Sequence, residues 1–395
     1  MKEIVIGLVS VGILGSGLTP NQEVPTYNQT IAPLIREKCL PCHSNSKGYA
    51  PFDFSTYESV TSRIELIRNQ VLAQNMPPVW AHSDFGRLAT VEQFSDDEAV
   101  QLQEWIRLKM PKGPIKASTV LQDKKAKTRT VEQYVFATAQ KVKAEGVPYW
   151  TVQTKDLNES GGQIDSFWLE PKNPRVVRYA VLAIVPKEMK LPAETVGSIN
   201  LPAKYIVGVW APGHSLWQLP NGLSIKFGPN SKLVVQTHLR PTGKAEAAEF
   251  KVFLKKPTQA NSKSPNWISL EKEEFTIPAG KSEVVEMTYP VNQDVSVISI
   301  FPEARFYAGR VQLLYTSKEG ASKTVYDNMR WDPYWVGNYM FPKPVILPKG
   351  GTLNAKFYYN NDEFCRVNEG KKPKAIKNGP TASDEICRIH LLVEP

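Results

Sequence analysis

The stretch RVVRYAVLAIV, residues 175–185, marks the point where the sequence changes to short segments with a hydrophobic period of two. Such alternation is typical of β-strands with one buried face. Further segments of this kind follow, separated by turns rich in glycine, proline and asparagine. They are residues 203–210, 231–241, 248–256, 295–302, 310–317, 353–361 and 387–394. The pattern predicts all-β tandem jelly-roll or β-sandwich domains in the C-terminal part of the chain.

The length of the chain predicts several domains. The chain has 395 residues, and single hydrophobic cores usually stop growing at about 250–300 residues. With 42% hydrophobic and 22% charged residues, the composition is that of a globular protein. The sequence shows neither a low-complexity tract nor a repeat of fixed period.

Residues 1–24 are predicted to be a signal peptide or an N-terminal anchor. The apolar run from Ile4 to Leu18 follows a short charged start, and it is shorter than the ~20 residues that span a bilayer. An uncleaved anchor is the alternative, because Glu3 lies beside Lys2 and no clear cleavage site follows. We therefore expect export to the periplasm or the exterior, with membrane attachment only through this segment if it is not cleaved.

The stretch KCLPCHSNSKG, residues 38–48, contains the pattern Cys-x-x-Cys-His at Cys39, Cys42 and His43. In an exported chain this pattern indicates a haem attachment site, because the two thiols bind the haem covalently while the adjacent imidazole reaches the iron. A thioredoxin-like redox pair and half of a zinc site are the alternatives. Neither requires a histidine directly after the second cysteine, so the sequence predicts one covalent haem c.

The flanking sequence predicts helices around this motif. A first helix is expected over residues 26–39, with apolar residues at helical spacing, and a second over residues 56–74. A closing helix should begin after Ser95 as the N-cap, with Glu98 completing a capping box. These features predict a small all-α cytochrome c-like domain over residues 25–113.

Met76 is the predicted second axial ligand of the haem iron. It follows the second helix and precedes Pro77 and Pro78, and thioether ligation raises the reduction potential relative to a second histidine. The alternatives are that Met76 fills a core gap and that His82, six residues farther on, is the ligand.

A basic linker is predicted over residues 114–145. The formal net charge is +9, and between Lys112 and Glu145 eight Lys or Arg residues face three acidic residues. A solvated linker surface explains this excess, and attraction to an acidic redox partner or an anionic membrane is the functional alternative. An exported chain is not expected to bind nucleic acid.

The C-terminal part resembles the copper type II, ascorbate-dependent monooxygenase family, which includes peptidylglycine α-hydroxylating monooxygenase. The stretches that carry the resemblance are APGHSLWQLPNG, VVQTHLRPTGK, WDPYWVGNYMF, LPKGGTLNAKFYYNN and SDEICRIHLL. Bacterial members carry a cytochrome c domain in front, and YNQTIAPLIREKCLPCH is similar to that domain. The resemblance implies a first monooxygenase-like sandwich over residues 146–270 and a second over residues 271–395.

Most copper ligands of that family have no match in this chain. The positions of the His-His pair hold Arg178 and Tyr179, those of the His-x-His motif hold Glu303 and Arg305, and that of the ligand methionine holds Ile386. Arginine keeps its proton and isoleucine has no lone pair, so coordination is lost at these positions.

Only His238 matches a ligand, and we interpret it as vestigial and structural, like His214 and His390. A substitute site of Glu303, Tyr179 and His238 would need these residues to converge. The resemblance also implies a disulfide between Cys365 and Cys387.

We therefore expect an exported monohaem c-type cytochrome that transfers one electron, with a copper-free sandwich as a docking or assembly module. The first alternative is a copper-dependent monooxygenase that receives electrons from the haem. The second is a haem-based module that binds a ligand in place of Met76.

Overall fold

The computed structural model describes most of the chain after the leader. The described residues are 24–44, 49–78, 80–88, 93–114, 131–146, 148–157, 160–191, 201–212, 217–257, 262–379 and 383–395. The predicted leader, except residue 24, therefore lies outside the described residues. Within the described ranges, no helix is long and apolar enough to cross a membrane.

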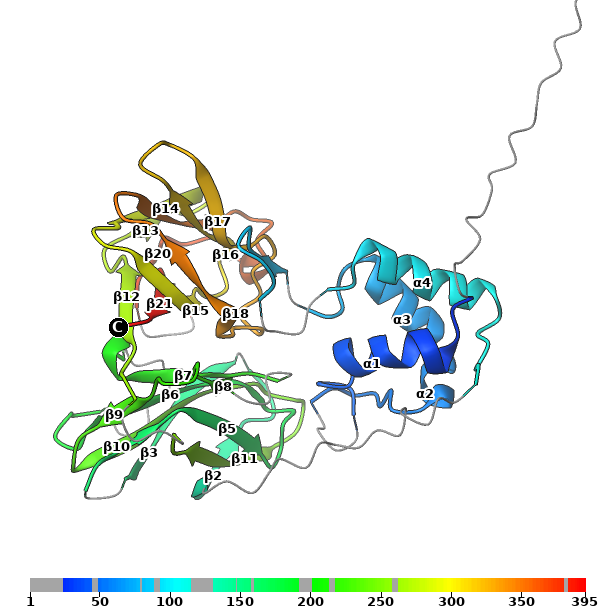
Figure 1. Ribbon diagram of the computed structural model, residues 1–395, viewed down its shortest axis with the longest axis horizontal. Helices are drawn as coiled ribbons and strands as arrows, with labels where there is room; N and C mark the ends of the chain where they lie inside the picture. Colours follow the sequence, from blue (N-terminus) through cyan, green and yellow to red (C-terminus); the bar gives the residue numbers. More distant parts are fainter. Residues whose placement is uncertain are drawn as a thin grey trace, which may run out of the picture.

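Residues 24–114, here called the helical region, hold the α-helices of the described chain (Figure 1). They are η1 (Tyr27–Ile31, a π-helical turn), α1 (Ala32–Lys38), α2 (Tyr57–Thr61), α3 (Ile64–Leu72) and α4 (Asp96–Arg107). Thr56 and Ser95 cap α2 and α4 with complete capping boxes. Glu98 is the partner of Ser95, as predicted.

The predicted small all-α cytochrome c-like domain is wrong as a fold class. The chain is 42% strand and 14% helix, and only α4 reaches 12 residues among the described helices. The second predicted helix is divided into α2 and α3, and the helical region also contributes a strand, β1 (Ala81–His82), to a sheet of the C-terminal part. The described residues therefore contain no clear, self-contained all-α domain.

The first β-sandwich has two four-stranded sheets. Its strands are β2 (Val131–Val142), β3 (Tyr149–Asp156), β5 (Ser166–Pro171), β6 (Val177–Pro186), β7 (Ile206–Trp210), β8 (Trp217–Gln218), β10 (Ser231–Leu239) and β11 (Glu246–Lys255), with the small pair β4 (Gly162–Ile164) and β9 (Ile225–Phe227) and the short 3-10 turn η3 (Ala203–Tyr205). One sheet has the order β3-β10-β6-β7 and the other β2-β11-β5-β8. Every strand pair in both sheets is antiparallel.

The second β-sandwich has a four-stranded and a five-stranded sheet. Its strands are β12 (Asn266–Glu271), β14 (Ser282–Pro290), β15 (Val295–Glu303), β16 (Ala308–Thr316), β17 (Ser322–Asn328), β18 (Tyr339–Leu347), β19 (Thr352–Asn360) and β21 (Arg388–Val393), with the pair β13 (Thr276–Ile277) and β20 (Ile376–Lys377) and the 3-10 turn η4 (Arg366–Asn368). The orders are β12-β21-β15-β18 and β1-β17-β16-β19-β14. The β-sandwich part of the fold prediction is thus confirmed.

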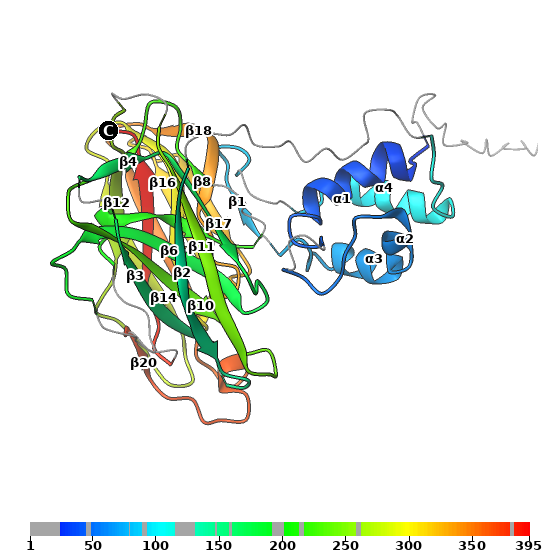
Figure 2. The ribbon, with the colours of Figure 1, turned by 90° about the horizontal axis from the view of Figure 1, so that it is seen from below.

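Strand β6, within the stretch 175–185, is buried on both of its faces. Val177, Ala180, Leu182 and Ile184 belong to the core of the first sandwich. The alternate residues Tyr179, Val181, Ala183 and Val185 belong to a larger core that continues into the second sandwich. The two sandwiches therefore pack against each other across the sheet that contains β6, which lies on the side of the first sandwich that faces the second (Figure 1). The rotated view shows the helical region to one side of both sandwiches (Figure 2).

The predicted linker, residues 114–145, contains a strand. Residues 131–142 form β2, which pairs with β11 at the edge of the first sandwich. The physical reason is that VEQYVFATAQKV is rich in β-branched and aromatic residues, whereas the lysine excess that suggested a linker lies mainly before it. Residues 115–130 lie outside the described chain.

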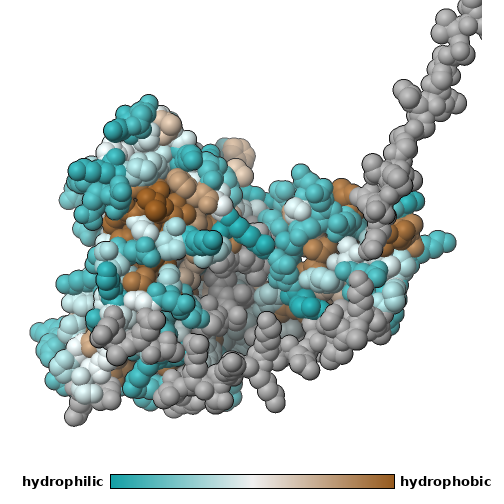
Figure 3. Space-filling model, viewed as in Figure 1, coloured by the Kyte–Doolittle hydropathy of each residue, from teal (hydrophilic) through white to brown (hydrophobic). Residues whose placement is uncertain are grey.

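The helical region is attached to the second sandwich through β1. Ala81 and His82 pair with Asn328 and Asp327 of β17. Beyond β1, the Asp84 carboxylate accepts a hydrogen bond from the Thr324 N–H at 2.7 Å, and the Asp84 N–H donates to the Thr324 carbonyl at 2.9 Å. The outer surface is mostly hydrophilic in the view of Figure 3, with separate hydrophobic patches on the second sandwich and the helical region.

Trp105 is the centre of the helical region's core. It is 0% exposed, and its indole donates a hydrogen bond to the Pro111 carbonyl at 3.0 Å. We predict that Trp105→Ala lowers the free energy of unfolding of the helical region by about 3–5 kcal/mol, because the change leaves a large cavity. Urea denaturation followed by far-ultraviolet circular dichroism measures this.

Val100 on the same helix provides the matched control, because it is 58% exposed. Val100→Ala should change the free energy of unfolding by less than about 0.5 kcal/mol. Equal effects of the two substitutions would contradict the packing described for α4.

Candidate functional site

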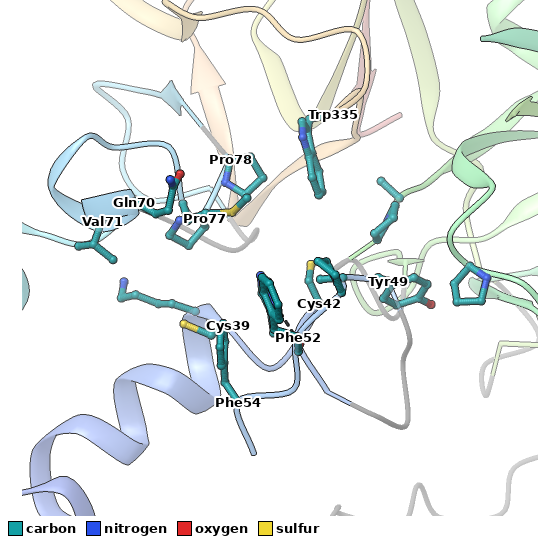
Figure 4. Close-up of a pocket in the computed structure, with 18 of the residues that line it drawn as sticks. Cys39, Cys42, Tyr49, Phe52, Phe54, Gln70, Val71, Pro77, Pro78 and Trp335 are labelled. Carbon is teal, nitrogen blue, oxygen red and sulfur yellow. Dashed lines mark hydrogen bonds between the residues drawn. The ribbon is translucent and has the colours of Figure 1, made fainter. Parts of the chain in front are cut away.

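The Cys-x-x-Cys-His motif forms a tight turn at the end of α1. Cys39 is the C-cap residue, and its carbonyl accepts hydrogen bonds from the N–H groups of Cys42 at 3.1 Å and His43 at 2.8 Å. These bonds hold both thiols and the imidazole on one turn of backbone. All three side chains line the same cavity (Figure 4).

Lys38 fixes this turn to α4. Its buried ammonium group lies 3.1 Å from the Glu98 carboxylate and donates a hydrogen bond to the Gln93 carbonyl at 3.1 Å. Glu98 is the residue that completes the capping box of α4. The charge of Lys38 is therefore compensated, and the position of the motif is coupled to the start of α4.

His43 has the hydrogen bond that a metal-ligating histidine usually has. Its Nδ1 lies 3.2 Å from the Phe52 carbonyl, and its ring stacks on Phe54 with 4.7 Å between centroids. Because a carbonyl can only accept, Nδ1 carries the proton and Nε2 keeps its lone pair. Burial lowers the pKa of His43, which favours the neutral, ligating form of the ring.

Met76 lines the same cavity, on the segment that follows α3. Its N–H donates to the Gln70 carbonyl at 3.2 Å, and the side chain of Gln93 donates hydrogen bonds to the carbonyls of Gln74 and Pro77. The Met76 side chain itself is 37% exposed, so it is not a core filler. His82, the rival ligand, lies on β1 outside this cavity.

The cavity has a volume of about 440 Å³, which is within the usual range for sites that hold a cofactor. The helical region contributes apolar walls that include Phe52, Leu66 and Phe94. Pro174 and Ala211 come from the first sandwich, and Trp335 and Val336 come from the second. The cavity is thus enclosed by three parts of the chain, and Trp335 faces the residues of the helical region (Figure 4).

The two thiols are not activated as nucleophiles. Burial raises the pKa of Cys39 to about 12 and that of Cys42 to about 11. Thioredoxin-like pairs have the opposite property, a lowered thiol pKa. Among the described residues no group of three or more His, Cys, Asp or Glu side chains could hold a metal ion.

Two arginines also line the cavity: Arg178 is the second residue of β6, and Arg240 lies just after β10. In the sequence, Arg178 stands out only at the position of a lost copper ligand, and no pattern points to Arg240. No motif marks them, because the fold brings their strand ends to the cavity. Both arginines are far from the cysteines in the sequence. They line the same cavity as the cysteines because the first sandwich packs against the helical region.

His238 and Tyr179 lie in a buried aromatic cluster between the two sandwiches. The His238 ring stacks on Trp150 at 4.6 Å and also contacts Tyr179 at 4.9 Å and Tyr334 at 6.2 Å between centroids. Trp150 donates a hydrogen bond to the Tyr179 hydroxyl at 2.9 Å. Neither ring nitrogen of His238 has a hydrogen-bond partner within the described chain.

Glu303 does not turn toward this cluster to form a substitute site. Its carboxylate lies 2.6 Å from Arg388 Nε and 3.4 Å from His390 Nε2. These two partners outweigh desolvation and lower the pKa of Glu303 to about 2. The Nδ1 of His390 bonds to the Ser269 hydroxyl at 2.8 Å, and its Nε2 faces the Glu303 carboxylate, so His390 is a buried residue engaged in packing.

The two remaining positions of the implied copper sites are also engaged in packing. The Arg305 guanidinium lies over the Trp150 ring, 4.7 Å from its centroid. Ile386 is buried, and its carbonyl accepts a hydrogen bond from the Tyr359 hydroxyl at 2.6 Å. His214 lies outside the described residues.

The disulfide implied by the resemblance is not formed in the structure, where Cys365 and Cys387 are both free thiols. Cys387 is buried in the core that runs through the second sandwich, and Cys365 packs against the same core. The two cysteines are thus part of the same core. A disulfide between them stays a prediction.

Comparison with known proteins assigns no family. Neither a scan against models of protein families nor a search of curated proteins finds a match. Among solved structures, the chain is similar to PNGase F, a glycosylasparaginase from Flavobacterium meningosepticum, with 11% identity, a TM-score of 0.31 and coverage of 67% of this chain and 96% of that one. A peptide-N(4)-(N-acetyl-beta-D-glucosaminyl) asparagine amidase gives 12% identity, a TM-score of 0.29 and the same coverage. Likenesses this weak carry no argument about the function of this chain.

We predict that His238 makes stability depend on pH. Burial, reinforced by the charges of Arg178 and Arg305, lowers its pKa from 6.5 to about 3. Between these values the unfolded chain binds the extra proton, so stability should fall as the pH drops from 6.5 toward 3, by about 1.4 kcal/mol per pH unit. His238→Phe keeps a stacked ring and should remove this contribution from urea denaturation measured across that range.

His82→Gln is the control, since His82 is an exposed histidine on β1. This variant should keep the pH dependence of the unmodified protein. If His238→Phe has the same pH dependence as the unmodified protein, His238 is not the group responsible.

Proposed function

We propose that this protein is an exported c-type haem protein that transfers single electrons. The observation that supports the proposal most strongly is that Cys39, Cys42, His43 and Met76 line one cavity. Two thiols, one imidazole and one thioether are the complete set of side chains for a covalently attached haem with histidine and methionine as axial ligands. Haem c, when bound, supplies iron that changes between the ferric and ferrous states.

Each residue has a defined task in this proposal. Cys39 and Cys42 form the two thioether bonds, and their position on one turn fixes the distance between the bonds. His43 offers Nε2 to the iron, because Nδ1–H donates to the Phe52 carbonyl. This hydrogen bond orients the ring and increases the basicity of the ligand nitrogen.

Met76, on the segment after α3, lines the cavity and would hold the iron through its thioether sulfur. Met76 is 37% exposed, so the residue is not enclosed in a hydrophobic core. The apolar walls around it limit water, which favours the uncharged thioether as a ligand. Methionine ligation would give a higher reduction potential than two histidines.

The resemblance to the copper type II monooxygenases remains part of the proposal only as an origin for the two sandwiches. Copper is not included, because Ile386 has no lone pair, the Arg305 guanidinium packs on Trp150, and the Glu303 carboxylate is paired with Arg388. We propose that the sandwiches serve as a docking or assembly module. The net charge of +9 would favour an acidic redox partner.

Denaturing electrophoresis tests whether the haem is attached covalently. We predict that the full chain, produced in a bacterium with c-type maturation machinery, carries one covalently bound haem that survives denaturing electrophoresis. The double variant Cys39→Ser, Cys42→Ser should lose it completely. The matched double variant Cys365→Ser, Cys387→Ser should keep it, and an unmodified protein without covalent haem would refute the proposal.

Axial ligation is tested by Met76→Ala. The variant should keep the covalent haem but lose the low-spin ferrous spectrum, and its reduction potential should fall, because the thioether ligand is gone. His82→Ala serves as the control and should change neither property. An unchanged spectrum and potential in Met76→Ala would show that Met76 is not the ligand.

A further inference from the structure

The cavity holds positive charge without a matching negative charge. Its charged lining residues are Lys38, Arg178 and Arg240, and no Asp or Glu belongs to the lining that the structure describes. Lys38 is already paired with Glu98. The two arginines therefore bring two positive charges, without a carboxylate in ion-pair contact among the described residues, to a cavity whose walls are mainly apolar.

Arg178 is held at the cavity wall by aromatic rings. Its guanidinium lies 5.2 Å from the ring centroids of both Tyr334 and Trp335. Its Nε is shielded from solvent and makes no hydrogen bond within the described chain. These two contacts hold the guanidinium at the cavity wall beside aromatic rings before any ligand arrives.

Arg240 is placed by the backbone of β10. Its N–H donates to the Val176 carbonyl at 2.9 Å, and its Nε is likewise shielded and without a hydrogen bond among the described residues. Among those residues no carboxylate is within ion-pair distance of either guanidinium. The carboxylate of Asp332 acts on Arg178 from farther away and accepts a hydrogen bond from the Tyr334 N–H at 2.8 Å.

Two like charges in one cavity repel each other, and each loses hydration there. The pKa of Arg178 is lowered to about 10 by burial and by the charge of Arg240, so the Arg178 side chain still carries its proton at neutral pH. Keeping two such charges without partners is unfavourable. An anionic ligand with two negative groups would remove this cost.

We propose that Arg178 and Arg240 bind the two propionate carboxylates of the haem, so that the first sandwich completes the haem site and sets its reduction potential. This inference rests on the proposed function. Arginine is well suited to the task, because its planar group of N–H donors matches the geometry of a carboxylate. The sandwich is then a part of the redox centre in addition to any docking role.

The experiment uses the full chain with attached haem and the variants Arg178→Gln and Arg240→Gln. Loss of one positive charge near the haem disfavours the ferrous form, so each variant should shift the ferric-to-ferrous equilibrium about tenfold. For a one-electron couple a tenfold change corresponds to about 59 mV. Voltammetry measures the potential, and the propionate bands in resonance Raman spectra should shift in the same variants.

Two further variants make the result specific. Arg68→Gln removes an exposed arginine of α3 that pairs with Glu65 at 3.0 Å and does not line the cavity; its potential should stay close to that of the unmodified protein. Arg178→Lys keeps the charge but not the planar donors, so it should keep most of the potential and still change the Raman bands. If circular dichroism shows that Arg178→Gln does not fold, Arg178→Lys replaces it as the test of Arg178.

The outcomes separate the two proposals. An unmodified protein without covalent haem overturns the proposed function and this inference with it. A protein with covalent haem, in which Arg178→Gln and Arg240→Gln leave the potential and the propionate bands unchanged, overturns this inference alone. Lowered potentials and shifted bands in both variants, with Arg68→Gln unchanged, support it.

Discussion

Burial of β6 on both faces is the constraint on which the rest of the structure depends. Alternate residues of this strand enter two different hydrophobic cores, so its sheet lies in the middle of the C-terminal part and cannot shift by one residue without exchanging the two faces. The strand begins at Val177, and Arg178 follows at its open end. A packing requirement deep between the sandwiches therefore determines which side chains reach the cavity.

The cavity is a product of this packing and of the attachment of the helical region. Hydrogen bonds of β1 and Asp84 with β17 hold the helical region against the second sandwich, while Tyr49 contacts Trp210 of the first sandwich with 5.7 Å between ring centroids. The cysteines and His43 come from one end of α1, and the opposite wall comes from loops and strand ends. The side chains of the Cys-x-x-Cys-His motif and the two arginines of the wall lie in one cavity only in the folded chain.

The sequence was most informative where a local rule dominates. The strand segments could be predicted because a half-buried strand needs alternation, and the α4 cap could be predicted because Ser95 and Glu98 satisfy free backbone donors. The Cys-x-x-Cys-His motif could be recognised because its three residues are close together in the sequence. Met76 could be named because it directly follows a predicted helix. The strand β2 was missed because nearby lysines dominated the composition of the segment, and β1 was missed because two residues leave no periodic pattern.

The remaining site residues could not be predicted because they depend on tertiary contacts. Arg178 and Arg240 belong to different strands, and nothing in their local sequence distinguishes them from surface arginines. The buried His238 without hydrogen-bond partners also required the structure, since the packing of Tyr334 against it joins the two sandwiches.

The three-part wall of the cavity has a consequence for biosynthesis. Chains are made from the N-terminus, so Cys39 and Cys42 leave the ribosome long before Arg178, Arg240 and Trp335 exist. Under the proposed function, a maturation enzyme that reaches the two thiols before the sandwiches dock would meet a helical segment that is open on one side. Once the sandwiches have folded and docked, the same thiols lie behind a wall built from three parts of the chain, so attachment would have to precede docking.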